Sequence, residues 1–200
     1  MSIPTLASWS LTEVRRRLAN LDAARRLAVA AGCTARVLPL FESMTEEGVR
    51  GLAAAVALAW RVAEGGTAGA SELRDARDAL EDMNADDDGE YSSPARVAAT
   101  VRRAVRALLD VVPGADGTRA GDCLFDAHEA VVHFVRYEDG RDVSVDTWPA
   151  EEEAWQAALL ALAEGGASAS ALRIHAEAPA SWWRWLEDEW GWERRRSDHA

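Results

Sequence analysis

The chain has 200 residues, of which 48% are apolar, and it carries a formal net charge of −12. Its length suits one sizeable hydrophobic core, and its acidity excludes nucleic acid as a partner because the two would repel each other. No apolar run is long enough to span a membrane, and the first residues lack the basic and apolar regions of a signal peptide. We therefore expect a cytoplasmic protein with no membrane partner.

The first part of the chain predicts five helices with recognisable ends. A capping box at Ser10 to Glu13 opens the first, and Asp22 caps a second that runs through residues 30–44. The third ends at a pair of glycines, the fourth begins at Ser71, and the fifth begins at Ser93-Pro94. We expect the first helix at about 11–19, the third at about 46–63, the fourth at about 71–83 and the fifth at about 94–112.

Residues 122–147 allow two interpretations. Asp139-Gly140 is a hairpin turn signal, which would make residues 130–147 a small β-hairpin. Over 122–136, however, the apolar residues fall on one helical face and four polar residues on the opposite one. We favour the helix, and we expect that polar face, which comprises Asp122, Asp126, Glu129 and His133, to be solvated.

The remaining sequence predicts a helix over about 149–163, a short segment before Pro179, and a last helix that Ser181 caps. We therefore expect an all-α protein, a single bundle of about seven to eight helices with a kinked central helix. One domain would cover residues 1–200, with a core bundle at 1–166 and a tryptophan-rich extension at 167–200 packing on it.

The stretch AAGCTARVLPLFESM, residues 30–44, has apolar residues on two nearly opposite sides, as a helix covered on both faces would. Arg36 lies within one of these apolar stripes, so it needs a carboxylate or carbonyl partner. Pro39 should kink or break the helix because it lacks an N–H and crowds the preceding turn. The favoured interpretation is a buried ion pair that ties Arg36 to a neighbouring helix. The alternative is a small anion-binding site.

The segment CTARVLPLFE within this stretch resembles the cysteine, arginine and Leu-Pro-aromatic signature of the domain of unknown function 416 family. It is also similar to the immunity proteins of bacterial polymorphic-toxin loci. The pattern extends to the alanine-rich helices at 94–112 and 122–136 but not past residue 166, and Ala35 stands where the family has glutamate. The resemblance implies an all-α bundle without enzymatic activity and a role in toxin neutralisation. The residues that carry it are Cys33, Arg36, Pro39, Phe41 and Trp60.

Enzyme and metal chemistry find little support in the sequence. His128 and His133 are five residues apart, about 140° around a helix, so they cannot share a zinc ion as an i, i+4 pair does. Cys33 and Cys123 are far apart and fall in helical patterns, which predicts buried thiols and no disulfide. We expect no metal, cofactor or catalytic residue. A small enzyme or metal-dependent hydrolase that uses the 122–133 face stays the alternative.

Two features point to a protein partner. Residues 86–90 concentrate acidic charge, and five tryptophans follow residue 181, more than one helical face can bury. The predicted partner-binding residues are Asp86, Asp87, Asp88, Glu90, Trp183, Trp190 and Trp192. We expect a non-enzymatic binding module, an immunity protein whose negative charge accelerates its association with a basic toxin. A housekeeping scaffold or a homo-oligomer stays open.

Overall fold

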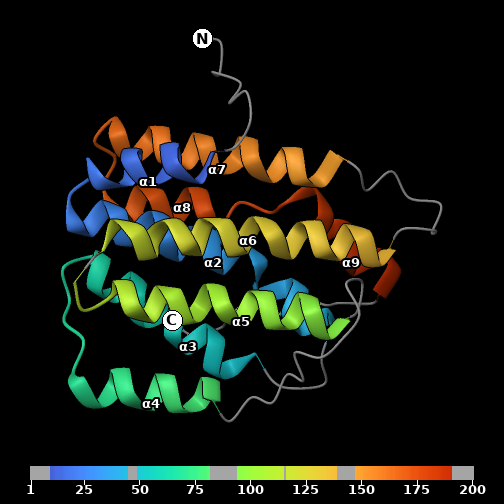
Figure 1. Ribbon diagram of the computed structural model, residues 1–200, viewed down its shortest axis with the longest axis horizontal. Coiled ribbons are helices and arrows are strands. Elements are labelled where there is room, and N and C mark those ends of the chain that lie inside the picture. The colour runs from blue at the N-terminus through green and yellow to red at the C-terminus, as the bar shows by residue number, and fades with distance from the viewer. Residues whose placement is uncertain (1–9, 45–48, 82–93, 115, 139–146, 191–200) are drawn as a thin grey trace.

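The structure is a computed structural model that describes residues 10–44, 49–81, 94–114, 116–138 and 147–190. It is an all-α bundle, and these ranges contain nine helices and no strand (Figure 1). The helices are α1 Leu11–Ala19, α2 Ala23–Met44, α3 Arg50–Ala63, α4 Ala70–Glu81, α5 Pro94–Val111, α6 Gly117–Glu138, α7 Trp148–Glu164, α8 Ala169–Ala176 and α9 Ser181–Trp190.

Two details of the predicted secondary structure need correction. The hairpin alternative is wrong for residues 130–138, because α6 is one continuous helix to Glu138; residues 139–146 lie outside the described residues. The segment after Gly166 is a helix of its own, α8, whose side-chain cap is Ser168 accepting from the amide of Ala171 at 3.2 Å.

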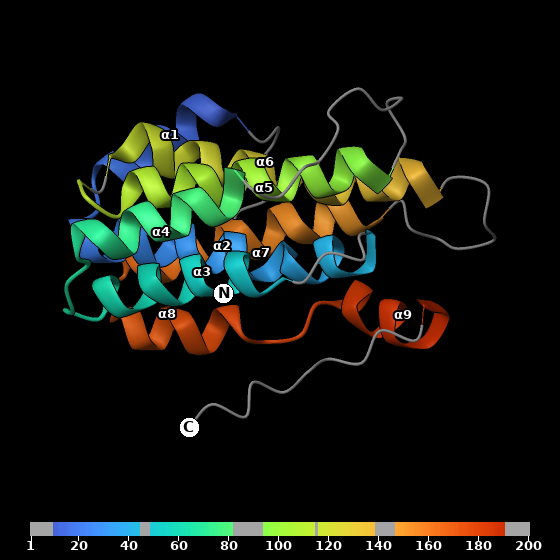
Figure 2. The ribbon, with the colours of Figure 1, turned by 90° about the horizontal axis from the view of Figure 1, so that it is seen from below.

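The second helix lies at the centre of the bundle. It contacts α3, α5, α6, α7, α8 and α9. Figure 2 shows α8 and α9 along one side of the molecule and α1, α5 and α6 along the other, with α2 between them. The prediction of a central helix covered on both faces is therefore confirmed. The helix continues through Pro39 to Met44, so the proline does not break it.

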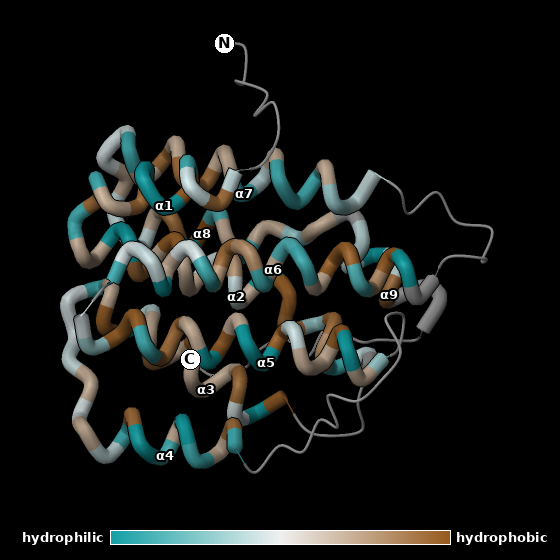
Figure 3. Tube along the Cα trace, in the orientation of Figure 1, coloured by the Kyte–Doolittle hydropathy of each residue, from teal (hydrophilic) through white to brown (hydrophobic). Residues whose placement is uncertain are grey.

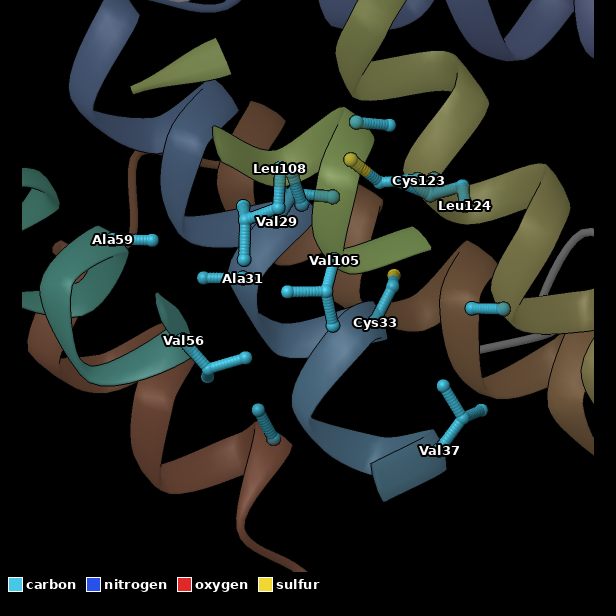
Figure 4. Packing of buried hydrophobic residues seen from close by; sticks show 14 of the residues in the cluster. Val29, Ala31, Cys33, Val37, Val56, Ala59, Val105, Leu108, Cys123 and Leu124 are labelled. Carbon is cyan, nitrogen blue, oxygen red and sulfur yellow. The ribbon is translucent and has the colours of Figure 1, made fainter. Parts of the chain in front are cut away.

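The core is built mainly from α2, α3, α5 and α6. Figure 4 shows Val29 and Cys33 of α2 in one buried cluster with Val105 and Leu108 of α5 and with Cys123 and Leu124 of α6. The outer helices α1 and α4 bury only two residues and one residue respectively, and both carry many hydrophilic residues in Figure 3. Over the described ranges, none of the helices is both long enough and apolar enough to cross a bilayer.

A glycine sets how closely α7 and α8 approach the central helix. A Cβ atom placed on Gly32 would lie 3.0 Å from Leu159 Cδ2 and 3.1 Å from Ala176 Cβ. Those neighbours belong to α7 and α8, so the missing side chain brings three helices together at one point. The approach holds both C-terminal helices against the turn of α2 that precedes Arg36.

Candidate functional site

The buried polar cluster around Arg36 is the most distinctive chemical feature of the described core. The residue is 5% exposed, and its Nε donates to Glu152 Oε2 at 2.8 Å. Its Nη1 donates to the carbonyl oxygen of Ala178 at 3.2 Å. The prediction that Arg36 is buried and bonded to a carboxylate is confirmed. Because the guanidinium is already paired with a buried carboxylate, the cluster is an internal ion pair rather than an anion-binding site.

Glu152 is completely buried and is held from a second side by Gln156. The Gln156 side chain donates to Glu152 Oε1 and to the carbonyl of Leu124, both at 3.2 Å. Burial raises the pKa of Glu152, while the Arg36 guanidinium and the Gln156 amide act in the opposite direction. The carboxylate thus has a partner on each oxygen, as a buried charge requires.

Aromatic rings enclose the same guanidinium. The Arg36 Cζ atom lies 4.3 Å from the ring centroid of Trp155 and 6.0 Å from that of Trp183, within the range of cation–π attraction. Trp155 in turn stacks on His175, with centroids 5.7 Å apart and an interplanar angle of 7°. Arg36 therefore joins α2, α7 and α8 to the start of α9.

The prediction that Trp183 is an exposed anchor for a partner is wrong. Its ring is 5% exposed, and its Nε1 donates to the carbonyl oxygen of Arg36 at 3.0 Å. Trp182 is also buried, and Trp185 packs edge-on against Phe134 and Trp148. The helix is surrounded on more than one side, so counting tryptophans on a single helical face overestimated how many remain exposed.

The other predicted partner-binding residues lie outside the described side chains. This applies to the loop residues Asp86, Asp87, Asp88 and Glu90, and to Trp192. Trp190 ends α9, but its side chain is not among those described. Their roles stay predictions.

The remaining motif residues are core residues. Cys33 and Phe41 are fully buried, and Trp60 is nearly so. Both cysteines are free thiols, and burial raises the pKa of Cys33 and of Cys123 well above the ordinary value. Thiols that resist ionisation in this way are packing groups rather than nucleophiles.

The polar face of α6 is engaged by ion pairs, and the expectation that it is solvated fails for His133, which is 4% exposed. Asp122 pairs with Arg15 at 2.6 Å, and Asp126 pairs with Arg103 at 3.3 Å. Within the described residues, no group of three His, Cys, Asp or Glu side chains could hold a metal ion. Asp122 and Asp126 thus meet arginines that α1 and α5 contribute, whereas Glu129 lies 3.8 Å from His133 Nε2.

The two shielded histidines make a testable contribution to acid sensitivity. Burial lowers the pKa of His133 and of His175, and Arg96 and Arg36 respectively act in the same direction. Arg96 Nε also donates to His133 Nε2 at 3.4 Å, a contact that protonation of this nitrogen would abolish. Below about pH 6.5 these two histidines therefore bind more protons in the unfolded chain than in the folded one, and their contribution to stability falls as the pH falls.

We expect the free energy of unfolding of a His133→Gln/His175→Gln variant to decline less than that of the wild type between about pH 7.5 and about pH 5.5. Urea unfolding of both proteins across this range measures the difference. Because every other titrating group is common to the two proteins, the difference isolates the histidines. Parallel declines would show that the histidines titrate alike in both states.

The geometry of the Arg36 cluster supports a structural role, since its charges and most of its hydrogen-bonding groups are bonded within the protein. No family model, curated protein or solved structure matches the chain.

Proposed function

We propose that the chain is a non-catalytic cytoplasmic binding module, an immunity protein that neutralises a basic bacterial toxin. The observation that carries the proposal is the net charge of −12 on a chain of 200 residues. A surface of this charge attracts a cationic partner over distances beyond direct contact and accelerates association. The resemblance of residues 33–42 to the immunity proteins of polymorphic-toxin loci points the same way.

The described interior supports binding over catalysis. The buried acid Glu152 is paired with Arg36, and burial raises the pKa of Cys33. On the 122–133 face, where the hydrolase alternative would have its site, Asp122 and Asp126 are paired with arginines. General acid–base or metal-assisted chemistry needs such groups to reach a substrate instead.

The acidic loop is expected to set the association rate. Changing Asp86, Asp87 and Asp88 to asparagine and Glu90 to glutamine removes four negative charges. With a basic toxin, association should slow severalfold and its salt dependence should flatten, whereas dissociation should change little. Binding kinetics at about 0.05 M and about 0.3 M salt measure both effects. Unchanged rates at low salt would reject steering by this loop.

Co-expression tests the function itself. The product of a toxin gene adjacent to the gene for this chain would be produced in cells with and without the chain. Restored growth together with a purified one-to-one complex is the expected result. Failure to restore growth and no complex at about micromolar protein would reject immunity for that pair. A Trp190→Ala/Trp192→Ala variant in the same assay tests whether these two residues are anchors.

A further inference from the structure

The outer side of α7 is apolar where a surface helix is normally charged. Residues 154–163 contain no charged side chain, although the helix lies at the edge of the bundle (Figure 1). The inward side buries Leu159, Leu160 and Ala163, while Ala161 and Leu162 are exposed, the latter by 42%. A helix that is apolar all round is usually covered on both sides, and this one is covered on only one.

The neighbouring helix α8 continues this apolar surface. Ala171 and Ile174 lie three residues apart on α8, so they share a side of that helix, and both are exposed. Ile174 is 73% exposed, by far the most among the large apolar side chains of the described residues. A single exposed isoleucine is common on protein surfaces. An exposed isoleucine beside the uncharged outer side of α7 forms a larger apolar patch, which is uncommon.

The Trp155–His175 contact places the two helices side by side. On α7, Trp155, Ala158 and Leu162 recur at i, i+3 and i+7 and thus share a side, and the two that precede Leu162 are half-buried. The chain reverses at Gly165 and Gly166, the latter in a left-handed conformation with φ 90°, so the helices run antiparallel. The five residues of what we call the α7–α8 seam are Trp155, Ala158, Leu162, Ala171 and Ile174.

One end of the seam is acidic. Because Trp155 faces His175 and the helices are antiparallel, the first turn of α7 lies near the last turn of α8. That end carries Glu151 and Glu153 from α7, and also Glu177, which follows α8 and pairs with Arg173 at 3.0 Å. Glu151 and Glu177 are exposed, and Glu153 is partly exposed. The surface is thus an apolar strip with negative charge at one end.

We propose that the α7–α8 seam is a docking surface for an amphipathic helix of a basic protein partner. The apolar side of that helix would cover Leu162 and Ile174, and lysine or arginine side chains at its end would meet Glu151 and Glu153. Charge decides between this occupant and a second copy of the chain, since two molecules of net charge −12 repel each other. The basic character of the partner rests on the proposed function.

A synthetic peptide tests the surface without any toxin. The probe is an amphipathic helix of about 18 residues, with leucine on one side and lysine on the other. A scrambled peptide of the same composition, which keeps the charge and loses the apolar side, is its control. The protein variants are Leu162→Asp and Ile174→Asp. The matched control is Ser71→Asp on α4, an exposed site at the opposite edge of the bundle from α7 (Figure 1).

We expect the ordered peptide to bind the wild type with about micromolar affinity and to shift amide NMR signals of residues 154–178. Each seam variant should weaken binding about tenfold, and Ser71→Asp less than about twofold. Circular dichroism verifies the fold of each variant, and Ile174→Ser replaces Ile174→Asp if the latter is unfolded. No binding, equal binding of the scrambled peptide, or shifts confined to other helices would overturn the proposal.

The outcome separates the surface from the proposed function. Rescue from a toxin that survives both seam substitutions would reject the seam and leave immunity standing. Specific peptide binding in a protein that rescues cells from no adjacent toxin would support the seam and count against immunity.

Discussion

Replacing Glu152 with leucine should lower the free energy of unfolding by about 3–5 kcal/mol, because it leaves the buried guanidinium of Arg36 without its carboxylate. Arginine cannot give up its proton to escape this cost. Among the contacts described above, its guanidinium keeps only the carbonyl of Ala178 and the rings of Trp155 and Trp183. Urea unfolding at neutral pH measures the loss.

The reverse substitution, Arg36→Met, should cost less. The carboxyl of Glu152 can become neutral by binding a proton, and without the guanidinium its pKa in the folded state rises further above that of the unfolded chain. The folded state then binds more protons, so the stability of this variant falls as the pH rises through that raised pKa. We therefore expect Arg36→Met to resemble the wild type more closely at about pH 5 than at about pH 8.

The double variant Arg36→Met/Glu152→Leu should recover most of the stability that Glu152→Leu loses, because both charges are then gone and apolar groups fill the space. An exposed pair serves as the control. Glu177 pairs with Arg173 at 3.0 Å with both side chains more than a third exposed, so Glu177→Leu should change stability by less than about 1 kcal/mol. Equal losses from Glu152→Leu and Glu177→Leu would show that the Arg36 pair is not buried in solution.

Trp183→Ala should lower the free energy of unfolding by about 3–5 kcal/mol, the usual cost of removing a buried tryptophan. The substitution opens a cavity beside Arg36 and removes the donor to its carbonyl oxygen. Trp183→Phe keeps one six-membered ring but loses the five-membered ring together with that hydrogen bond, so it should cost less, about 1–3 kcal/mol. Urea unfolding and near-ultraviolet circular dichroism report both changes.

This result separates a core residue from a binding anchor. A tryptophan that anchors a partner would leave the stability of the free protein unchanged and raise only the dissociation rate. Full stability of Trp183→Ala would therefore return this residue to the binding surface and contradict its position in the structure.

The sequence predicts the local features of this fold well because they depend on short spacings. The 3.6-residue period located the helices, and two apolar stripes placed the helix of Arg36 at the centre. Asp22 caps α2 by accepting from the amide of Arg25 at 2.8 Å, but Ser10 makes no side-chain cap hydrogen bond, so the predicted capping box is wrong. The burial of Arg36 followed from the pattern of apolar stripes. The pattern did not identify the partner of Arg36, because Glu152 lies 116 residues away and any other acidic residue was an equal candidate.

A weak signal for that partner was present. Glu152 and Gln156 are four residues apart and share the buried side of α7 with Leu159, so they are polar residues on an otherwise apolar stripe. Polar residues on an apolar stripe need a buried partner, so Glu152 on α7 called for one just as Arg36 on α2 did. The burial of Trp183 left no comparable signal, since it depends on how many helices surround α9.

The reach of the Arg36 contacts along the chain constrains the order in which the protein can fold. Its partners lie 116, 142 and 147 residues further on, in α7, in the segment after α8 and in α9. A ribosome adds roughly 5–20 residues per second, so α2 waits for many seconds before these groups have been synthesised. During that interval α2, α5 and α6 can already pair, with the guanidinium still in water. The guanidinium of Arg36 therefore loses its bound water late in folding, when the C-terminal helices pack on the bundle.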